Sequence, residues 1–449
     1  MTKEFPDSVA IVGAGVFGLS TALAIAKRYP STIVHLIDRF EPPAPDGSSV
    51  DTTRCLRADY NDPVYAELAS ESMKIIAADE EIAPFFHQCG MSFAFDGNEG
   101  DKWGKLWKSS RDCALKVAGP EFIDDFHNNK ELFQSIHGES TEPESIDSLG
   151  RETWWNNGYR NRANGFIDAA RAIKGYYEKT KKFENIKTTF KPVDNIVYKD
   201  GTNEAKGVRF TDGSIISSDI VIVAAGAWSA KLVNLDGITK HSAIEVAWYK
   251  ITEEEAQQWK NMSITTNFTT GINLFPPYEG EVKILRRSAG YKNTITIPDQ
   301  NPLSNSSTKK TISYPRTIVS NPDDWIPEDA ETALRENMKE IMPSLASRPF
   351  DRTKLCWLTQ TTTANFLIDN HPDLKNVVLA TGGSAHGWKF VPILGDKVTD
   401  FIEGKLDDTL KKMWSWNEKV VVSEDNGSAP RMPGEPQEIG DVVRARPQY

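Results

Sequence analysis

Three glycines near the amino terminus have the spacing of a loop that binds a pyrophosphate, Gly13-x-Gly15-x-x-Gly18. The first allows a tight turn, the second lets a diphosphate approach the backbone, and the third lets a helix pack against a strand. The diphosphate would lie over the helix N-terminus, where free N–H groups and the helix dipole favour negative charge. Asp38 follows Gly18 by twenty residues, where a carboxylate can accept a hydrogen bond from a ribose hydroxyl. The spacing predicts a dinucleotide site, and other segments must distinguish FAD from NAD.

A second set of residues could bind carboxylates. The Arg57 guanidinium can hold a carboxylate through two parallel hydrogen bonds and stays charged at any working pH. In the segment 281–287, the alternation of a strand puts Lys283, Leu285 and Arg287 on one face. Each cation could instead form a surface salt bridge or mark an edge strand. Both interpretations stay open at this point.

The four cysteines, Cys55, Cys89, Cys113 and Cys356, show neither metal-site spacing nor a disulfide framework, so we expect no metal. A thiolate can attach covalently to a cofactor only if it is held beside it. For Cys356 the alternative is a core cysteine, which is also the interpretation of Cys55 and Cys89.

Buried β-branched runs must position these groups. Residues 9–12 and 33–37 are predicted to be parallel strands around a helix from 16 to about 26. Residues 220–223 read as another buried strand, which ends in a tight turn of small residues. Further predictions are strands at 89–95, 355–359 and 377–381, a hairpin turn at 199–201, an antiparallel sheet under a substrate cavity at 243–313, helices at 65–78, 162–181, 327–342 and 392–403, a charged, irregular excursion at 97–149, and a surface or loosely ordered tail at 424–449.

Composition narrows the classes of protein. The chain has 449 residues, 12 Trp and 39% hydrophobic residues, as expected of an ordered protein of two or three domains. The net charge of −11 and the lack of a basic block argue against a nucleic-acid partner. No run is long and apolar enough for a membrane span, and no secretory signal is present. We expect an intracellular protein, cytoplasmic rather than peroxisomal, because the C-terminus is not of the Ser-Lys-Leu type.

Four segments together carry a family resemblance. They are the glycine fingerprint, Asp51-Thr-Thr-Arg54-x-x-Arg57, the strand end 224–228, and the C-terminal stretch that includes Cys356-Trp357, Asp369-x-His-Pro and 383–390. In order and spacing the chain resembles the monomeric sarcosine oxidase family of FAD-dependent amine oxidases. Within that family it looks most like fungal L-saccharopine and L-pipecolate oxidases, and fructosyl amino acid oxidases come next.

The resemblance implies an α/β fold with a Rossmann-type FAD-binding domain and an antiparallel-sheet substrate domain, as in glutathione reductase and D-amino-acid oxidase. It further implies a monomer that takes a small amino-acid substrate and O2. The corresponding domain prediction is FAD-binding residues 1–80, 150–230 and 350–410, substrate-domain residues 81–149 and 231–349, and a tail at 411–449.

The family also implies a covalent FAD, held by a thioether from Cys356 to the flavin 8α-methyl group. Arg54 would lie along the flavin and orient it, and His386 would be either a neighbour of the ring or a structural residue. The predicted cofactor-binding residues are Gly13, Gly15, Val16, Phe17, Gly18, Asp38, Arg39, Ser48, Ser49, Thr53, Arg54, Ala225, Gly226, Trp228, Cys356, Gly383, Ala385, His386, Gly387 and Lys389.

For catalysis the resemblance assigns the substrate carboxylate to Arg57 and Lys389. It assigns oxygen activation to Lys283, whose ammonium would stabilise the negative charge that develops as O2 takes its first electron. The family places a histidine at Arg287 in enzymes that act on sarcosine, so this cation suggests a substrate with an extra carboxylate, as in saccharopine. Fructosyl enzymes carry a lysine in place of Arg54, which counts against a sugar-derived substrate.

The leading hypothesis is an FAD-dependent oxidase of a secondary-amine amino acid, with L-saccharopine as the expected substrate, that yields an imine and hydrogen peroxide. Alternatives of the same fold are an L-pipecolate or sarcosine-type oxidase, a deglycating fructosyl amino acid oxidase, and an amine oxidase of secondary metabolism. A flavin dehydrogenase or a non-catalytic flavoprotein is the alternative of another class.

Overall fold

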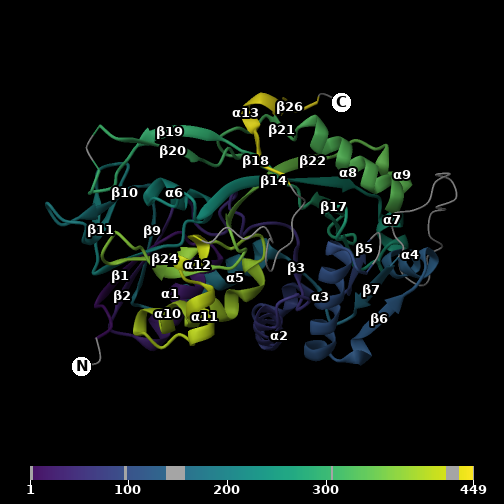
Figure 1. Ribbon diagram of the computed structural model, residues 1–449, viewed down its shortest axis with the longest axis horizontal. Helices are drawn as coiled ribbons and strands as arrows, with labels where there is room; N and C mark the ends of the chain where they lie inside the picture. Colours follow the sequence, from purple (N-terminus) through teal and green to yellow (C-terminus); the bar gives the residue numbers. More distant parts are fainter. Residues whose placement is uncertain (1–3, 96–98, 138–156, 305–306, 421–433, 448–449) are drawn as a thin grey trace.

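The computed structural model describes residues 4–95, 99–137, 157–304, 307–420 and 434–447. Two large sheets organise the molecule (Figure 1). Strands β1, β2, β9 and β24 lie at one end and β5, β6 and β7 at the other, and the long strand β14 runs between them.

The first sheet contains the glycine fingerprint. Its strand order is β23-β24-β13-β1-β2-β9, and every pairing is parallel except that of β23 with β24. The strands are β1 (Ser8–Val12), β2 (Ile33–Asp38), β9 (Ile186–Phe190), β13 (Ile220–Val223), β23 (Leu367–Asn370) and β24 (Val377–Thr381). This parallel arrangement confirms the predicted Rossmann-type architecture.

The two faces of this sheet are covered by different elements. Val9 and Ile11 pack toward the helices α1 (Val16–Arg28), α5 (Ala169–Thr180) and α10 (Val391–Glu403). The alternate residues Ala10 and Val12 pack toward a small sheet formed by β10 (Val193–Tyr198), β11 (Ala205–Phe210) and β12 (Ile215–Ser217). Burial on both faces explains why β1 is an uninterrupted apolar run.

The fingerprint glycines have the mechanical roles expected of them. Gly13 has φ of +112°, which a residue with a side chain rarely adopts, and a Cβ there would lie 2.3 Å from the Ala224 carbonyl oxygen. A Cβ on Gly18 would lie 1.7 Å from the Gly13 carbonyl oxygen. Gly18 therefore lets helix α1 approach the end of β1 closely, and Gly13 lets the loop between them pass the end of β13.

The second large sheet lies on the other side of the cavity from the glycine loop and is mostly antiparallel. Its order is β25-β18-β14-β17-β16-β15-β5-β7-β6, with β22 paired to β14, and only β15–β5 and β18–β25 are parallel. The predominantly antiparallel sheet confirms the predicted fold class. Its strands are β5 (Met91–Phe95), β6 (Ile123–Phe126), β7 (Asn157–Asn161), β14 (Thr239–Lys250), β15 (Ile264–Asn267), β16 (Ile272–Leu274), β17 (Glu281–Arg286), β18 (Tyr291–Lys292), β22 (Arg352–Thr361) and β25 (Gln437–Glu438).

Strand alternation gives this sheet one face for packing and one for the site. Leu355 and Trp357 pack with α8 (Glu328–Ile341) in one core cluster, whereas Cys356 and Leu358 belong to the cluster on the opposite face.

The remaining strands form small sheets. One contains β3 (Arg54–Leu56), β4 (Phe86–His87) and β8 (Gly165–Ile167), and two further pairs are β19 (Thr294–Pro298) with β20 (Lys309–Ser313) and β21 (Asp324–Trp325) with β26 (Arg444–Ala445). The remaining helices are α2 (Pro63–Ala78), α3 (Lys102–Ala118), α4 (Asn129–His137), α6 (Ser229–Leu232), α7 (Glu253–Gln258), α9 (Pro343–Ala346), α11 (Asp408–Met413), α12 (Asn417–Val420) and α13 (Ile439–Val442), and the 3₁₀ turns are η1 (Ala83–Phe85), η2 (Pro120–Phe122), η4 (Gly226–Trp228) and η5 (Gly387–Phe390).

Two local predictions are wrong. The excursion predicted to be irregular holds α3, whose buried Trp107, Ser110 and Ala114 recur at helical spacing among charged residues, together with β6 and α4. Residues 138–149 of that prediction lie outside the described residues. The helix predicted from residue 162 begins only at Ala169, because the preceding residues form β8 and the Asp168 side chain caps the helix by accepting from Arg171 N–H.

The last described segment is anchored rather than loose. Residues 434–447 add β25 beside β18 and β26 beside β21, while residues 424–433 lie outside the described part. The domain division stays a prediction, although β7 and β22, which it places in the FAD-binding part, pair with strands of the second sheet. No helix in the described ranges is long and apolar enough to cross a membrane.

Candidate active site

A cavity of about 320 Å³ is lined by residues of both sheets and reaches from the glycine loop to β17. Three predicted site residues, Gly18, Thr53 and Lys283, are not in its lining. The predicted residues that do line it are Gly13, Gly15, Val16, Phe17, Asp38, Arg39, Ser48, Ser49, Arg54, Arg57, Ala225, Gly226, Trp228, Arg287, Cys356, Gly383, Ala385, His386, Gly387 and Lys389.

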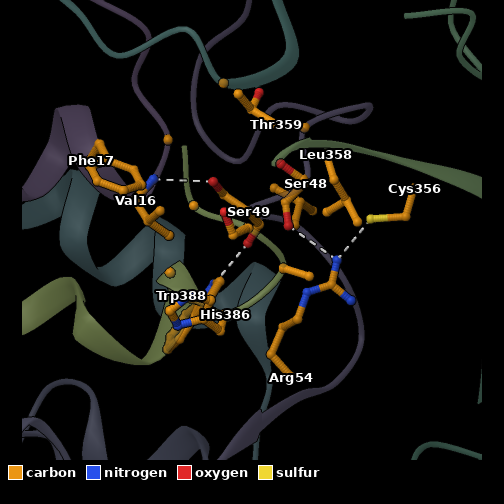
Figure 2. A pocket seen from close by; sticks show the side chains of 18 of the residues that line it. Val16, Phe17, Ser48, Ser49, Arg54, Cys356, Leu358, Thr359, His386 and Trp388 are labelled. Atoms are coloured by element: carbon orange, nitrogen blue, oxygen red, sulfur yellow. Dashed lines mark hydrogen bonds between the residues drawn. The ribbon is translucent and has the colours of Figure 1, made fainter. Parts of the chain in front are cut away.

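The glycine-loop end of the cavity is stabilised by side chains that form hydrogen bonds with backbone N–H and carbonyl groups. Ser49 Oγ accepts from the Val16 N–H at 3.1 Å, and Trp388 Nε1 donates to the Ser49 carbonyl at 2.9 Å (Figure 2). Asp38 accepts from the Ala14 N–H at 2.7 Å and from the Arg39 N–H at 2.6 Å. Asp38 thus stabilises the loop itself, and its contact with a ribose stays a prediction.

This end fits the pyrophosphate of FAD. Helix α1 starts at the cavity with Gly15 as its N-cap and no acidic residue in its first turn, so the helix dipole favours an anion there, although Ser49 Oγ already accepts from the Val16 N–H. A Cβ on Gly15 would lie 2.7 Å from Ser49 Oγ and would narrow the space beside the helix N-terminus in which a phosphate would bind. Among the described residues, the buried Thr359 Oγ1 also has no hydrogen-bond partner, and Thr359 lines the cavity.

Cys356 lies on β22, opposite Ile244 of β14, and its side chain faces the cavity. Its Sγ accepts a hydrogen bond from Arg54 Nη2 at 3.4 Å, and the same guanidinium nitrogen is 3.1 Å from the Ser48 carbonyl oxygen (Figure 2). The Arg54 contact holds this sulfur at the cavity wall, and a thiol can attach to a cofactor only from a position beside it. In the described part of the chain, no cluster of His, Cys, Asp and Glu is arranged to hold a metal ion.

Arg54 belongs to a compensated cluster, which we define as Asp51, Arg54 and Lys283, and whose other two members are not part of the cavity lining. Asp51 pairs with Arg54 and lies 2.9 Å from Lys283 Nζ, and Lys283 also donates to the Thr53 carbonyl at 2.6 Å. Burial disfavours the Asp51 carboxylate, but the two cations hold its pKa below the usual range. Burial lowers the pKa of Lys283 to about 8, and the charge of Asp51 opposes this shift. Phe275, which lines the cavity, lies 4.4 Å from Lys283 Nζ, so the ammonium sits just behind the wall.

A second pair of cations, the open cluster of Arg57 and Lys389, lines the cavity itself. Lys389 Nζ donates to the Tyr60 hydroxyl at 2.9 Å and to the His386 carbonyl at 3.3 Å, and Arg57 donates to the Asp59 backbone carbonyl. Within the described ranges, neither cation forms an ion pair with a carboxylate. Burial and the charge of Arg57 lower the pKa of Lys389 well below its ordinary value.

His386 has the structural contacts of a neutral ring. Its Nε2 lies 2.8 Å from the Ala364 carbonyl, its Nδ1 lies 3.1 Å from the Tyr60 hydroxyl, and its ring stacks on Phe366 at 4.8 Å. Burial, assisted by Lys389, lowers the pKa of His386 to about 3. The ring nevertheless lines the cavity, so it serves the site as a rigid support.

Arg287 lies one residue beyond β17 and faces the same cavity as Leu285. It donates to the Asn267 carbonyl at 3.2 Å, and its guanidinium lies 5.4 Å from the Phe268 ring. The predicted alternation is therefore correct for Leu285 and Arg287, whereas Lys283 is held behind the lining by Asp51. Lining residues that sequence analysis missed include Asp59, Tyr60, Met91, Phe93, Thr266, Asn273 and Phe275.

The parallel sheet, the glycine loop and the cavity beside them define a flavin-dependent oxidoreductase. A model of the family described as FAD dependent oxidoreductase matches residues 8–401, and the chain belongs to this family. FAD dependence and the oxidoreductase class are thereby confirmed.

Named relatives refine the class. The chain is 27% identical to L-saccharopine oxidase of Schizosaccharomyces pombe, a match that covers 93% of this chain and 94% of the relative. It is 25% identical to monomeric sarcosine oxidase of Bacillus sp. (strain NS-129), over 86% of this chain and 90% of that one. The predicted resemblance to FAD-dependent amine oxidases is confirmed by these matches.

Solved structures support the same fold. A thermally stable mutant of fructosyl peptide oxidase superposes with a TM-score of 0.83 at 25% identity, covering 98% of this chain and 99% of that one. The deglycating fructosamine oxidase of Aspergillus fumigatus superposes with a TM-score of 0.79 at 25% identity, covering 99% and 98%.

Proposed function

We propose that this chain is an oxidase of an amino acid with a secondary amine, with L-saccharopine as its substrate and FAD attached through Cys356. The observation that carries the proposal is the open cluster. Arg57 and Lys389 line the same cavity as Cys356 and have no carboxylate of the described chain as ion-pair partner. Buried charges of one sign are costly, so a cavity that retains two of them is suited to an anionic ligand.

The carboxylate of the substrate would bind between these cations. Arg57 supplies a planar pair of donors, and Lys389 supplies a point charge about which the carboxylate can pivot. When the two cations bind the substrate carboxylate, the neighbouring amine would be oriented toward the part of the cavity beside Cys356, where the flavin would be attached. The chain therefore has no need of a strong general base, because a free secondary amine supplies the electron pair itself.

The overall reaction balances with O2 and water as the two co-reactants. The carbon next to nitrogen loses a hydride equivalent and the nitrogen loses a proton, which leaves a C=N bond. FAD, when bound, accepts these two electrons and passes them to O2, which takes two protons and becomes hydrogen peroxide. Water then adds to the C=N carbon, and cleavage of the C–N bond gives a carbonyl compound and an amine.

Two further cations support this assignment. Lys283 would stabilise the negative charge that develops on oxygen, from a position behind the wall that is fixed by Asp51 and the Thr53 carbonyl. Arg287 lines the cavity beyond the open cluster and would bind the second carboxylate of an N-substituent. Saccharopine has such a carboxylate, whereas sarcosine and pipecolate do not.

The mass of the denatured protein tests the cofactor assignment. We expect a mass increased by one FAD in the wild type, and the mass of the bare polypeptide in Cys356→Ser. The matched control is Cys113→Ser, which removes another buried cysteine that is not part of the cavity lining and should keep the adduct. A bare wild-type mass, or an adduct retained in Cys356→Ser, would refute attachment at Cys356.

A peroxide assay across L-saccharopine, L-pipecolate, sarcosine and a fructosyl amino acid tests the substrate. A deglycating activity is the second candidate, because fructosyl peptide oxidase and fructosamine oxidase superpose over nearly the whole chain. We expect the highest kcat/KM on L-saccharopine. Preference for the fructosyl compound would instead favour the second candidate.

We further propose that the protein is a monomer and that its FAD-binding and substrate domains follow the predicted boundaries, except where β7 and β22 join the second sheet. Light scattering of the purified protein should give a mass near the 50.1 kDa of one chain. A mass of two chains or more would refute the monomer.

A further inference from the structure

Tyr60 contacts both cations of the open cluster. It is 1% exposed and follows the segment that carries Arg54 and Arg57. Its hydroxyl accepts a hydrogen bond from Lys389 Nζ at 2.9 Å, and the Arg57 guanidinium lies over its ring at 4.7 Å. A single side chain thus meets one cation through its polar end and the other through its aromatic face.

The hydrogen bonds around Tyr60 have a defined direction. The Ala364 carbonyl can only accept, so His386 Nε2 carries the proton and donates to it. Because the ring is neutral, its Nδ1 is an acceptor, and the Tyr60 hydroxyl donates to it at 3.1 Å. The oxygen lone pairs of Tyr60 are then left for Lys389.

The same network leaves one donor of Lys389 for a ligand. An ammonium group has three N–H donors. Two of them point to the Tyr60 hydroxyl and the His386 carbonyl. The third is not used by any hydrogen bond among the described residues, and Lys389 lines the cavity together with Arg57.

We propose that Tyr60 is a positioning residue that holds Arg57 and Lys389 in the arrangement that receives the substrate carboxylate, with His386 fixing the orientation of its hydroxyl. This inference rests on the proposed function, since it concerns the same carboxylate site. Tyr60 does not itself contact the reacting atoms.

The test separates the two ends of the tyrosine. Tyr60→Phe keeps the ring under Arg57 and removes the acceptor of Lys389, whereas Tyr60→Leu removes both. The probe is propionate, a carboxylate without an amine, titrated into the holoenzyme and followed by the flavin absorbance. We expect the Kd of propionate to rise about tenfold in Tyr60→Phe and further in Tyr60→Leu, because hydrogen bonds to charged groups are the stronger class. With the amine substrate, KM should rise by a similar factor while kcat changes little.

The pH dependence of propionate binding distinguishes a positioning role of Tyr60 from a merely structural one. Propionate binding requires the ammonium form of Lys389, so it should weaken as the pH rises through the pKa of this lysine. Loss of the hydroxyl acceptor disfavours the ammonium, so Tyr60→Phe should move this midpoint to lower pH. The titratable or charged groups that face Lys389 are Cys55, Arg57, Asp59, Tyr60 and His386.

Tyr249→Phe is the matched control, because it removes another buried tyrosine hydroxyl, one outside the cavity lining and without a hydrogen-bond partner among the described residues. It should leave both the Kd and the midpoint unchanged. His386→Phe is the independent variant in case Tyr60→Phe does not fold, and it should weaken propionate binding in the same direction by a smaller factor.

Unchanged propionate binding and an unchanged midpoint in Tyr60→Phe would overturn the inference. If L-saccharopine is not oxidised but propionate binding still depends on Tyr60, the substrate assignment fails and the positioning role stands. If L-saccharopine is oxidised and propionate binding ignores Tyr60, only the positioning role fails.

Discussion

Two buried groups of cations lie at the cavity, and they differ in whether the chain supplies a counter-charge. In the compensated cluster, Asp51 pairs with both Arg54 and Lys283. In the open cluster, Arg57 and Lys389 have only carbonyl, hydroxyl and aromatic partners among the described residues. Asp59 follows Arg57 by two residues and is one of the charged groups near Lys389, but it forms no ion pair with either cation in the described chain. Its carboxylate instead accepts hydrogen bonds from Tyr159, Asn161 and Asn164.

The difference in counter-charge suits the two clusters to different roles, one in stabilising the fold and one in binding a ligand. Buried cations that share a carboxylate can be stable without a ligand, whereas removing that carboxylate leaves them without a counter-charge, which is costly. A buried group with uncancelled charge is more favourable when an anion binds. We therefore propose that the compensated cluster fixes the groups beside Cys356 and that the open cluster binds the substrate.

The largest effect is expected from Asp51→Asn. The substitution leaves Lys283 and Arg54 buried without their counter-charge, which should cost about 3–5 kcal/mol of stability. The thermal midpoint of the holoenzyme should fall by many degrees. Asp212→Asn, which breaks an exposed pair with Lys191, is the control and should change the midpoint little. Equal effects of the two substitutions would show that the compensated cluster does not stabilise the fold.

Lys283→Met should act on oxygen rather than on the amine. Loss of a fixed cation near developing negative charge should slow reoxidation of the reduced enzyme about 10²–10³-fold and spare reduction by the substrate. Stopped-flow measurement of the two half-reactions separates them. In the wild type, reoxidation should slow as the pH rises through about 8, because Lys283 loses its proton there, and Lys283→Met should lack this dependence. Unchanged reoxidation in the variant would remove the assignment.

Arg57→Ala should weaken substrate binding. Removing one charge-assisted partner of the carboxylate costs about 1.5–3 kcal/mol, so we expect KM to rise about 10–150-fold. Arg352→Ala is the control, since Arg352 is paired with Glu281 and is not part of the cavity lining. An unchanged KM in Arg57→Ala would show that the open cluster is not the carboxylate site.

The smallest effect is expected from Arg287→Ala, and it should depend on the substrate. The kcat/KM for L-saccharopine should fall about tenfold, as for loss of one partly exposed charged hydrogen bond. The value for L-pipecolate, which lacks the second carboxylate, should stay the same. Equal losses on both substrates would argue that Arg287 shapes the cavity rather than recognising a second acid.

The sequence predicted best those features that depend on short-range patterns. The glycine loop, the apolar strands beside it and the alternation of Leu285 with Arg287 follow from local spacing and sterics, and the structure has them. The role of Asp51 was not predictable, because its pairing with Lys283 joins residues 232 positions apart whose approach depends on the packing of the two sheets. Tyr60 was missed for the same reason, although its place three residues after Arg57 was a usable signal. Helix α3 was missed because its apolar residues are spread among many charges.

The central claim is that this chain oxidises a secondary-amine amino acid and passes the electrons to oxygen. Mixing the purified yellow protein with L-saccharopine in the absence of air tests it most directly. We expect the flavin colour to be lost and to return within seconds when air is admitted, and one hydrogen peroxide to form for each amine oxidised. A flavin that stays yellow with every amine of the panel, or a bleached protein that stays colourless for minutes in air, would contradict it.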